Sequence, residues 1–269
     1  APAPAPAPPP AAGARSTTFG DGWTATADVD GVRVTRDGAT VLLHWGVAFD
    51  DASRADPPRY FWTKLVAPRH AVTAVRPATY SAIQFPYYFV EGDVADRGQP
   101  GFVALRVVSV NGTAFCIEVQ TASRDAFVRL FPDQDKLEAI RGANRFAIGA
   151  DVAGAWVSAS AAMQAMYYVS TGGYAGTNAT AISDRFSFGA DGSYASEHKG
   201  ASGMVGAQKF FQEKIRGTYT TSAWALTVQQ ADGKVTTYDA SYELARGGRI
   251  LHLRNRAYAG MAYTLVPAP

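Results

Sequence analysis

Six turn-forming residue pairs, each containing glycine, constrain the fold of this sequence more than any other feature. They separate short runs in which apolar and polar residues alternate, and they are Asp30-Gly31, Asp37-Gly38, Asn111-Gly112, Asp191-Gly192, Asp232-Gly233 and Gly247-Gly248. Pairs of this kind favour two-residue turns with positive φ, which join neighbouring antiparallel strands. The sequence therefore predicts a protein built largely from antiparallel β-hairpins.

Residues 17–150 are predicted to form an α+β sandwich, with an antiparallel sheet and helices on one of its faces. Apolar residues recur at helical spacing in residues 60–66, after Ser123, and in residues 133–141. Asp50, Asp51 and Asp56 precede the first of these segments and lack the regular alternation of a calcium-binding loop. We expect them to cap helices or form turns rather than bind a cation.

Residues 151–269 are predicted to form a closed antiparallel barrel or a sandwich. Eight or so short alternating runs are separated by turn signals, and the only helical candidate is Gln208–Lys214. The glycine-rich segment Gly200–Gly206 lacks the Lys-Ser/Thr ending of a phosphate-binding loop. We expect it to be a flexible loop, and it is a candidate lid at the mouth of a barrel.

Aromatic residues alternate along several of these runs and predict an unusual barrel interior. Those expected to line it are Phe186, Phe188, Trp224, Tyr238 and Tyr242. An ordinary packed core favours Leu, Ile and Val, so an interior rich in Tyr and Trp points to a ligand cavity. The alternative is a small barrel filled by its own side chains.

Residues 151–269 resemble the lipocalin-like β-barrel group. The resemblance rests on Gly154-x-Trp156, the hairpin around Asp191-Gly192 and the Leu251-x-Leu253 closing region. It implies that Trp156 packs across one end of the barrel beneath an arginine from the last strands, for which Arg254 or Arg256 is the candidate. The two-cysteine bridge of many lipocalins is absent, because the chain contains one cysteine. Residues 17–150 resemble, more faintly, the sheet-plus-helices fold of exported PsbP-type proteins.

Charge and cysteine content exclude several classes of function. The formal net charge is +2, which excludes a strongly basic nucleic-acid binder. The single cysteine, Cys116, excludes an intramolecular disulfide and Cys-based zinc motifs, and it lies in a strand-like run where we expect it to be buried. No apolar run reaches the ~18 residues of a membrane span.

An alanine- and proline-rich run opens the sequence and is predicted to be a linker over residues 1–16. Proline fixes φ and lacks an N–H donor, so this run favours polyproline II rather than helix or sheet. We interpret it as the start of an exported periplasmic, cell-surface or secreted protein whose signal peptide has been removed. An interdomain or lipid-anchor linker remains the alternative.

No catalytic, cofactor or metal motif is recognisable. His44, His70, His198 and His252 are not at metal-binding spacing, and no nucleophile elbow occurs. The sequence therefore predicts no cofactor and no metal, and a barrel with a polar mouth would make His198 the first residue to inspect.

Three functions follow from these observations, in order of preference. The first is a non-enzymatic module that holds an apolar or amphipathic small molecule in the barrel. The second is a structural or self-assembling protein of the cell envelope or exterior. The third is a hydrolase whose His, carboxylate and hydroxyl groups meet only in the folded protein.

Overall fold

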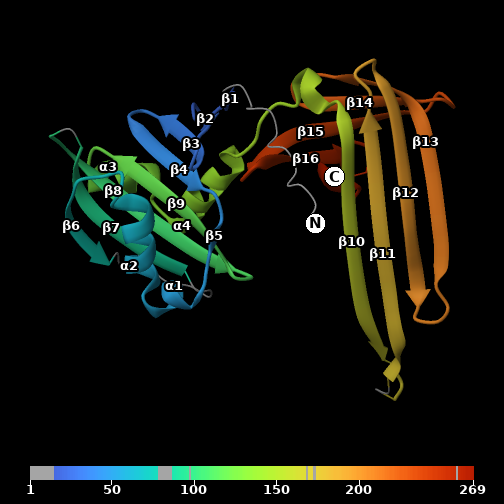
Figure 1. The fold of residues 1–269 in the computed structure, drawn as a ribbon, viewed down its shortest axis with the longest axis horizontal. Coiled ribbons are helices and arrows are strands. Elements are labelled where there is room, and N and C mark those ends of the chain that lie inside the picture. Colours follow the sequence, from blue (N-terminus) through green and yellow to red (C-terminus); the bar gives the residue numbers. More distant parts are fainter. Residues whose placement is uncertain (1–14, 78–86, 97, 168, 172–173, 259) are drawn as a thin grey trace, which may run out of the picture. The chain divides into compact units, whose positions relative to one another are not determined.

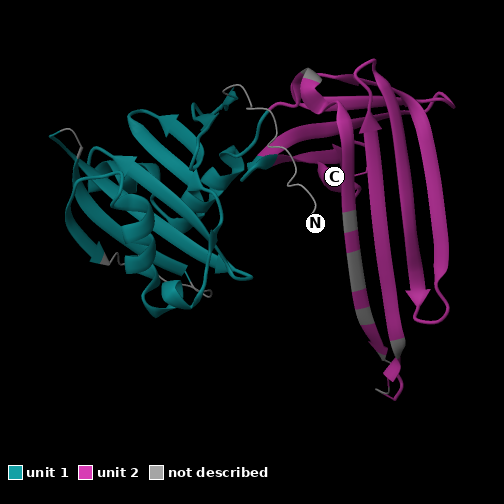
Figure 2. Ribbon diagram, viewed as in Figure 1, with its two compact units in different colours: residues 1–146, 244–248 teal, residues 147–243, 249–269 magenta. Residues whose placement is uncertain are grey.

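The computed structural model describes residues 15–77, 87–96, 98–167, 169–171, 174–258 and 260–269 (Figure 1). Most of the predicted linker lies outside these residues. The chain divides into two compact units, residues 1–146 with 244–248 (unit 1) and residues 147–243 with 249–269 (unit 2) (Figure 2). Both units are rich in antiparallel β-structure, as predicted.

Unit 1 contains a sheet of nine described strands with short helices. Its strands are β1 (Ser16–Thr18), β2 (Thr24–Ala27), β3 (Gly31–Arg36), β4 (Ala39–His44), β5 (Val47–Ala48), β6 (Val72–Pro77), β7 (Tyr87–Asp96), β8 (Gln99–Val110) and β9 (Thr113–Thr121). Its helical segments are α1 (Asp51–Ala55), α2 (Pro57–Phe61), η1 (Trp62–Val66), α3 (Arg124–Leu130), α4 (Gln134–Ala139) and η2 (Ile140–Ala143). The strand order is β1-β2-β3-β4-β9-β8-β7-β6, and β5 pairs with β9.

Two of the predicted turns in unit 1 have the expected backbone conformation. Asp37 and Gly38, between β3 and β4, have φ values of 50° and 79°. Asn111 and Gly112, between β8 and β9, have φ values of 49° and 76°. Consecutive positive φ angles suit tight hairpins between twisted strands, so these predictions are confirmed.

Helices cover both faces of this sheet, so the prediction of helices on one face is wrong. Val90 and Val103 pack against the segment formed by α2 and η1. Phe89 and Phe102, their neighbours in sequence, pack instead against Phe127 of α3, with ring centroids 6.0 and 5.5 Å apart. Adjacent strand residues point to opposite faces, and β7 and β8 are apolar on both.

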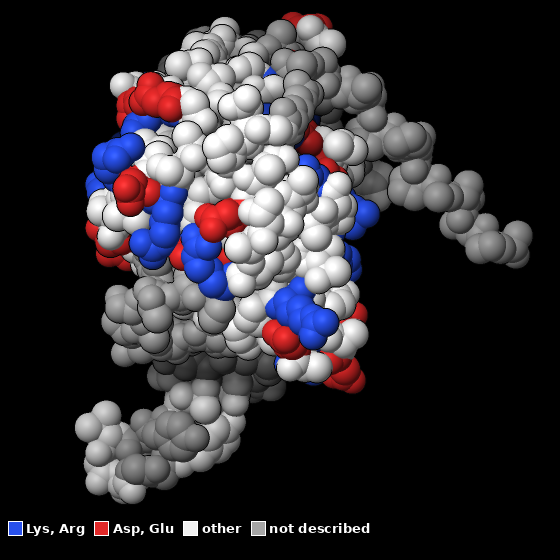
Figure 3. Space-filling view, turned by 90° about the vertical axis from the view of Figure 1, so that its left-hand side faces the viewer, with Lys and Arg blue, Asp and Glu red and all other residues white. Residues whose placement is uncertain are grey.

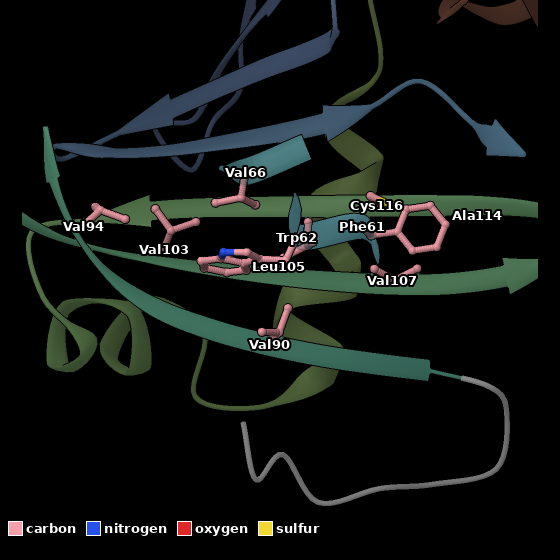
Figure 4. Close-up of a cluster of buried hydrophobic side chains, with 10 residues drawn as sticks. All are labelled: Phe61, Trp62, Val66, Val90, Val94, Val103, Leu105, Val107, Ala114 and Cys116. Atoms are coloured by element: carbon pink, nitrogen blue, oxygen red, sulfur yellow. The ribbon is translucent and has the colours of Figure 1, made fainter. Parts of the chain in front are cut away.

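A cluster of buried hydrophobic side chains in unit 1 lies beneath α2 and η1 (Figure 4). Phe61 and Trp62 rest on valine and leucine side chains of β7 and β8, and Cys116 of β9 is buried there as predicted. Asp50 and Asp56 begin the covering helices, because their side chains accept hydrogen bonds from the backbone N–H groups of Ser53 and Arg59. The capping prediction for these two residues is therefore confirmed.

Unit 2 is a closed antiparallel barrel of eight strands preceded by a short helical turn, η3 (Gly149–Val152). Consecutive strands pair along the chain, and β10 pairs with β17 to close the barrel. The strands are β10 (Gly154–Tyr167), β11 (Tyr174–Phe188), β12 (Ser193–Met204), β13 (Lys209–Thr221), β14 (Ala225–Gln230), β15 (Val235–Ala245), β16 (Gly248–Asn255) and β17 (Ala262–Pro267). The predicted barrel is confirmed.

Two local predictions in unit 2 are wrong. Gln208–Lys214, predicted as helical, lies largely in β13, and most of the predicted loop Gly200–Gly206 lies in β12. These segments form a hairpin in which Gly200 pairs with Phe211 and Ser202 pairs with Lys209. Sheet hydrogen bonds to a neighbouring strand outweigh the weak local helical pattern here.

The first four strands of the barrel are longer than most of the others, so only part of unit 2 is closed (Figure 1). β10 pairs with β17 at Trp156 and Val157, and β13 pairs with β14 from Gly217 onward. Beyond these positions, β10 to β13 continue as a four-stranded sheet, which we call the open sheet. Its edges are Ser158–Tyr167 of β10 and Lys209–Ile215 of β13.

Candidate functional site

The closed end of the barrel is sealed by a cluster of Asp151, Trp156, Tyr242 and Arg249. The ring centroids of Trp156 and Tyr242 are 5.8 Å apart. The Arg249 guanidinium lies 5.5 Å from the Trp156 ring and 4.4 Å from the Tyr242 ring. It also donates to the Asp151 carboxylate at 2.6 Å and to the Asp151 carbonyl at 2.7 Å. These contacts fix the first strand against the last ones at this end.

Of the residues predicted to lie at the barrel end, the glycine and the tryptophan lie there and the two candidate arginines do not. Gly154 starts β10 with a φ of 132°, a conformation that favours glycine, and Trp156 is buried. Arg254 is exposed, and the exposed Arg256 pairs with Asp239 at 2.7 Å. Arg249, at the start of β16, occupies the place predicted for Arg254 or Arg256.

Aromatic side chains fill the barrel interior next to the closed end. Phe186 lies 6.3 Å from Phe188 and 4.9 Å from Tyr263 between ring centroids, and Tyr238 lies 6.3 Å from Tyr263. Four of the five predicted lining residues, Phe186, Phe188, Tyr238 and Tyr242, are buried. Trp224 is 41% exposed and lies before β14. The buried aromatics form a packed floor.

A row of polar side chains lies above this floor. Asp184 of β11 pairs with His198 of β12, which pairs with Glu213 of β13. His198 Nδ1 lies 2.7 Å from Asp184 Oδ1, and its Nε2 lies 3.1 Å from Ser196 Oγ. The imidazole is also wedged between Phe186 and Tyr263, with ring centroids 5.4 and 5.9 Å away. His198 is therefore held in one orientation at the point where the barrel opens.

The Asp184–His198–Ser196 chain has the hydrogen-bond order of a hydrolytic triad, but the serine is poorly placed for attack. Ser196 is buried and shares its row of the sheet with Phe186 and Ile215, on the closed side of His198. A molecule arriving from the open sheet meets His198 before it meets the hydroxyl. The arrangement thus suits orientation of His198 better than nucleophilic catalysis.

A mostly apolar groove of about 840 Å³ lies on the open sheet, next to the polar row. It is lined by Ser160, Ala181, Ile182, Ser183, Lys199, Gly200, Ala201, Phe210, Phe211 and Gln212. Ile182, Gly200 and Phe211 are paired across the sheet, each two residues from a member of the Asp184–His198–Glu213 row. Residues two apart on a strand share a face, so the Ile182 and Phe211 side chains continue the barrel interior.

Unit 1 contains a separate polar pocket of about 560 Å³ beside Glu118. Glu118 Oε2 lies 3.2 Å from His44 Nε2, Glu118 Oε1 lies 2.9 Å from His70 Nε2, and Arg69 pairs with the same carboxylate. Burial raises the pKa of Glu118, but the hydrogen bonds from both histidines and the charge of Arg69 outweigh it and hold the pKa at about 2. The carboxylate therefore remains ionised although it is buried.

This cluster holds two of the four histidines that the sequence left without a role. Its members come from β4, from β9 and from the segment after η1, and no spacing rule links them. Within the described residues, no group of His, Cys, Asp or Glu side chains is arranged to hold a metal ion. Arg69 lies against both His44 Nε2 and Glu118, in the position that a cation would need.

No protein-family model matches the chain, and no curated protein matches its sequence. None of the helices among the described residues has both the length and the apolar character needed to cross a membrane. On the face drawn in Figure 3, basic and acidic side chains lie next to each other. This mixture matches the balanced charge of the sequence.

Proposed function

We propose that unit 2 is a lipocalin-like binding module that holds an amphipathic small molecule in the open half of its barrel. The observation that carries this proposal is that an apolar groove lies beside an oriented polar row, since Ile182, Gly200 and Phe211 are each two residues from a member of that row. The groove volume of about 840 Å³ lies within the range of small-molecule sites, roughly 300–1,000 Å³. The apolar part of the ligand would lie against Ile182 and Phe211, and its polar end would face His198 and Asp184.

This proposal moves the ligand from the sealed interior expected from the sequence to the open side. Phe186 supports the His198 ring, while Phe188 packs on Phe186 and Tyr238 packs on Tyr263, so these residues would lie beneath the ligand rather than surround it. A packed floor and an open groove also give the ligand a direct path from solvent. Binding at this site requires no opening of the closed end.

The test is a fluorescence titration of the full chain with dansyl-undecanoic acid, an acyl chain with an environment-sensitive ring. We expect saturable binding with enhanced emission. Ile182→Asp and Phe211→Asp each place a charge in the groove and should weaken binding by about tenfold or more, since burying one such side chain is worth about 1.5–3 kcal/mol. Val235→Asp, at an exposed position of β15 outside the groove lining, is the matched control.

Two results would overturn the proposal. One is unsaturable binding by the wild-type protein. The other is equal affinity in the wild-type, Ile182→Asp and Phe211→Asp proteins while circular dichroism shows that all three are folded. A further variant, His198→Gln, tests the polar end, and it should weaken binding of the probe, whereas Val235→Asp should not.

A further inference from the structure

The free edge of β10 is unlike any other edge in unit 2. From Ser158 to Tyr167 its backbone pairs with β11 on one side and with no described strand on the other. This stretch contains neither a charged residue nor proline. Edge strands normally carry such residues because unpaired N–H and C=O groups otherwise attract another strand.

Exposed apolar side chains add to this feature. Met163 of β10 is 75% exposed and Met166 is 42% exposed. Since a bare backbone edge is best satisfied by another extended strand, the partner of this edge must itself supply a β-strand.

The opposite edge of the open sheet is protected. Lys209–Ile215 of β13 carries Lys209, Glu213 and Lys214. Pairing two copies through β13 would strip water from these charged side chains, which disfavours that contact. The charge distribution thus favours β10 over β13 as the contacting edge.

We propose that a second copy of this chain pairs with the protein through β10, with the two β10 strands antiparallel about a two-fold axis. The open sheets of the two copies then form one continuous sheet. Pairing β10 with β10 brings no charges of that edge together, and it leaves a charged β13 edge at each outer side. Growth therefore stops at a dimer, whereas pairing of β10 with β13 would leave an open β10 edge for further chains.

The first experiment measures the mass of the full chain by sedimentation equilibrium across a concentration series. We expect a monomer–dimer equilibrium. Met163→Lys places a charge on the β10 edge at an exposed position and should raise the dimer dissociation constant on the order of tenfold. Gln212→Lys places the same charge on the β13 edge and should leave the constant unchanged.

The second experiment locates the contact by disulfide cross-linking. The one native cysteine, Cys116, is buried, so a single introduced thiol reports the contact. Only the residue on the two-fold axis faces its own copy, so at least one of a series of single cysteines placed along Ser158–Tyr167 should form a covalent dimer under mild oxidation. Gln212→Cys should form no covalent dimer under the same conditions.

Several results would overturn the proposal. They are a monomer at every concentration, assemblies that grow beyond two copies, and a dimer disrupted by Gln212→Lys but not by Met163→Lys. Association with phosphatidylcholine vesicles without self-association would also overturn it, since the edge would then serve a lipid surface. Neither Met163 nor Met166 lines the groove, so loss of the dimer and loss of ligand binding are separate outcomes.

Discussion

The guanidinium of Arg249 stacks on the ring of Tyr242, 4.4 Å from its centroid, while its N–H groups bind Asp151. One side chain therefore links the turn before β10 to β15 and β16. The barrel closes at this end through aromatic stacking, hydrogen bonding and charge together.

Arg249→Ala should lower the free energy of unfolding by about 1–2 kcal/mol, because it removes a partly buried cation–π contact and an ion pair. Urea denaturation followed by tryptophan fluorescence measures the change. Arg254→Ala is the matched control and should change stability by less than about 0.5 kcal/mol, since Arg254 is exposed. Equal losses in both variants would contradict a specific role for Arg249.

Glu118→Gln should destabilise unit 1 by about 1–3 kcal/mol near neutral pH, because it removes the buried carboxylate that accepts hydrogen bonds from His44 and His70 and pairs with the partly exposed Arg69. The pKa of Glu118 is lowered from 4.5 to about 2, so the ionised group stabilises the fold above pH 4.5. This stabilisation is lost as the pH falls from 4.5 towards 2. Urea unfolding at about pH 6 and about pH 3 should show that the difference in unfolding free energy between wild type and variant is smaller in acid. A difference in unfolding free energy that stays constant with pH would contradict the lowered pKa of Glu118.

Gly200→Ala should weaken binding of dansyl-undecanoic acid. A Cβ at this position would lie 2.4 Å from the Phe211 ring and 2.9 Å from the Ala181 carbonyl oxygen, so the ring must move within the groove. The contact with the Ala181 backbone oxygen should also lower stability, so affinity is compared under conditions in which circular dichroism shows that the variant is folded. Ala231→Ser, a small change at an exposed position outside the groove lining, is the control. Identical affinities for Gly200→Ala and wild type would show that Phe211 does not contact the ligand.

Cys116 should resist thiol reagents in the folded protein. Burial raises its pKa to about 12, and the thiolate is the reactive form. Modification by an aromatic disulfide reagent should therefore follow global unfolding as urea is added. Rapid labelling of the native protein would contradict the burial of this residue.

Two of the turns in unit 1 and two of the helix caps were predictable because each depends on neighbouring residues, and the barrel was predictable from the number of alternating runs between turns. Asp30-Gly31 is an exception, since Gly31 begins β3 and has no positive φ. Asp37-Gly38 and Asn111-Gly112 adopt the positive φ angles that such pairs favour, and Asp50 and Asp56 cap the helices that follow them. Local chemistry alone decides such features.

The groove and the Glu118 cluster were not predictable, because both depend on how distant segments pair. The groove exists because β10 to β13 continue after β14 and β17 have ended, and sequence periodicity does not reveal where a partner strand stops. In β13, Phe210, Phe211 and Ile215 fit a short helix as well as a strand, and only pairing with β12 decides between them. Glu118 meets His44 and His70 across separations of 74 and 48 residues.

The unequal strand lengths divide unit 2 into two tiers with different protection from solvent. In the ring of eight strands, an inner amide proton can leave only when the ring itself opens. In the outer part of β10 and β13, one flank has no neighbouring strand among the described residues, and fraying of that single strand exposes its amides. Backbone amides of the outer tier should therefore exchange with deuterium well before the amide of Tyr242. A strand that pairs with the free edge of β10 should slow exchange there first.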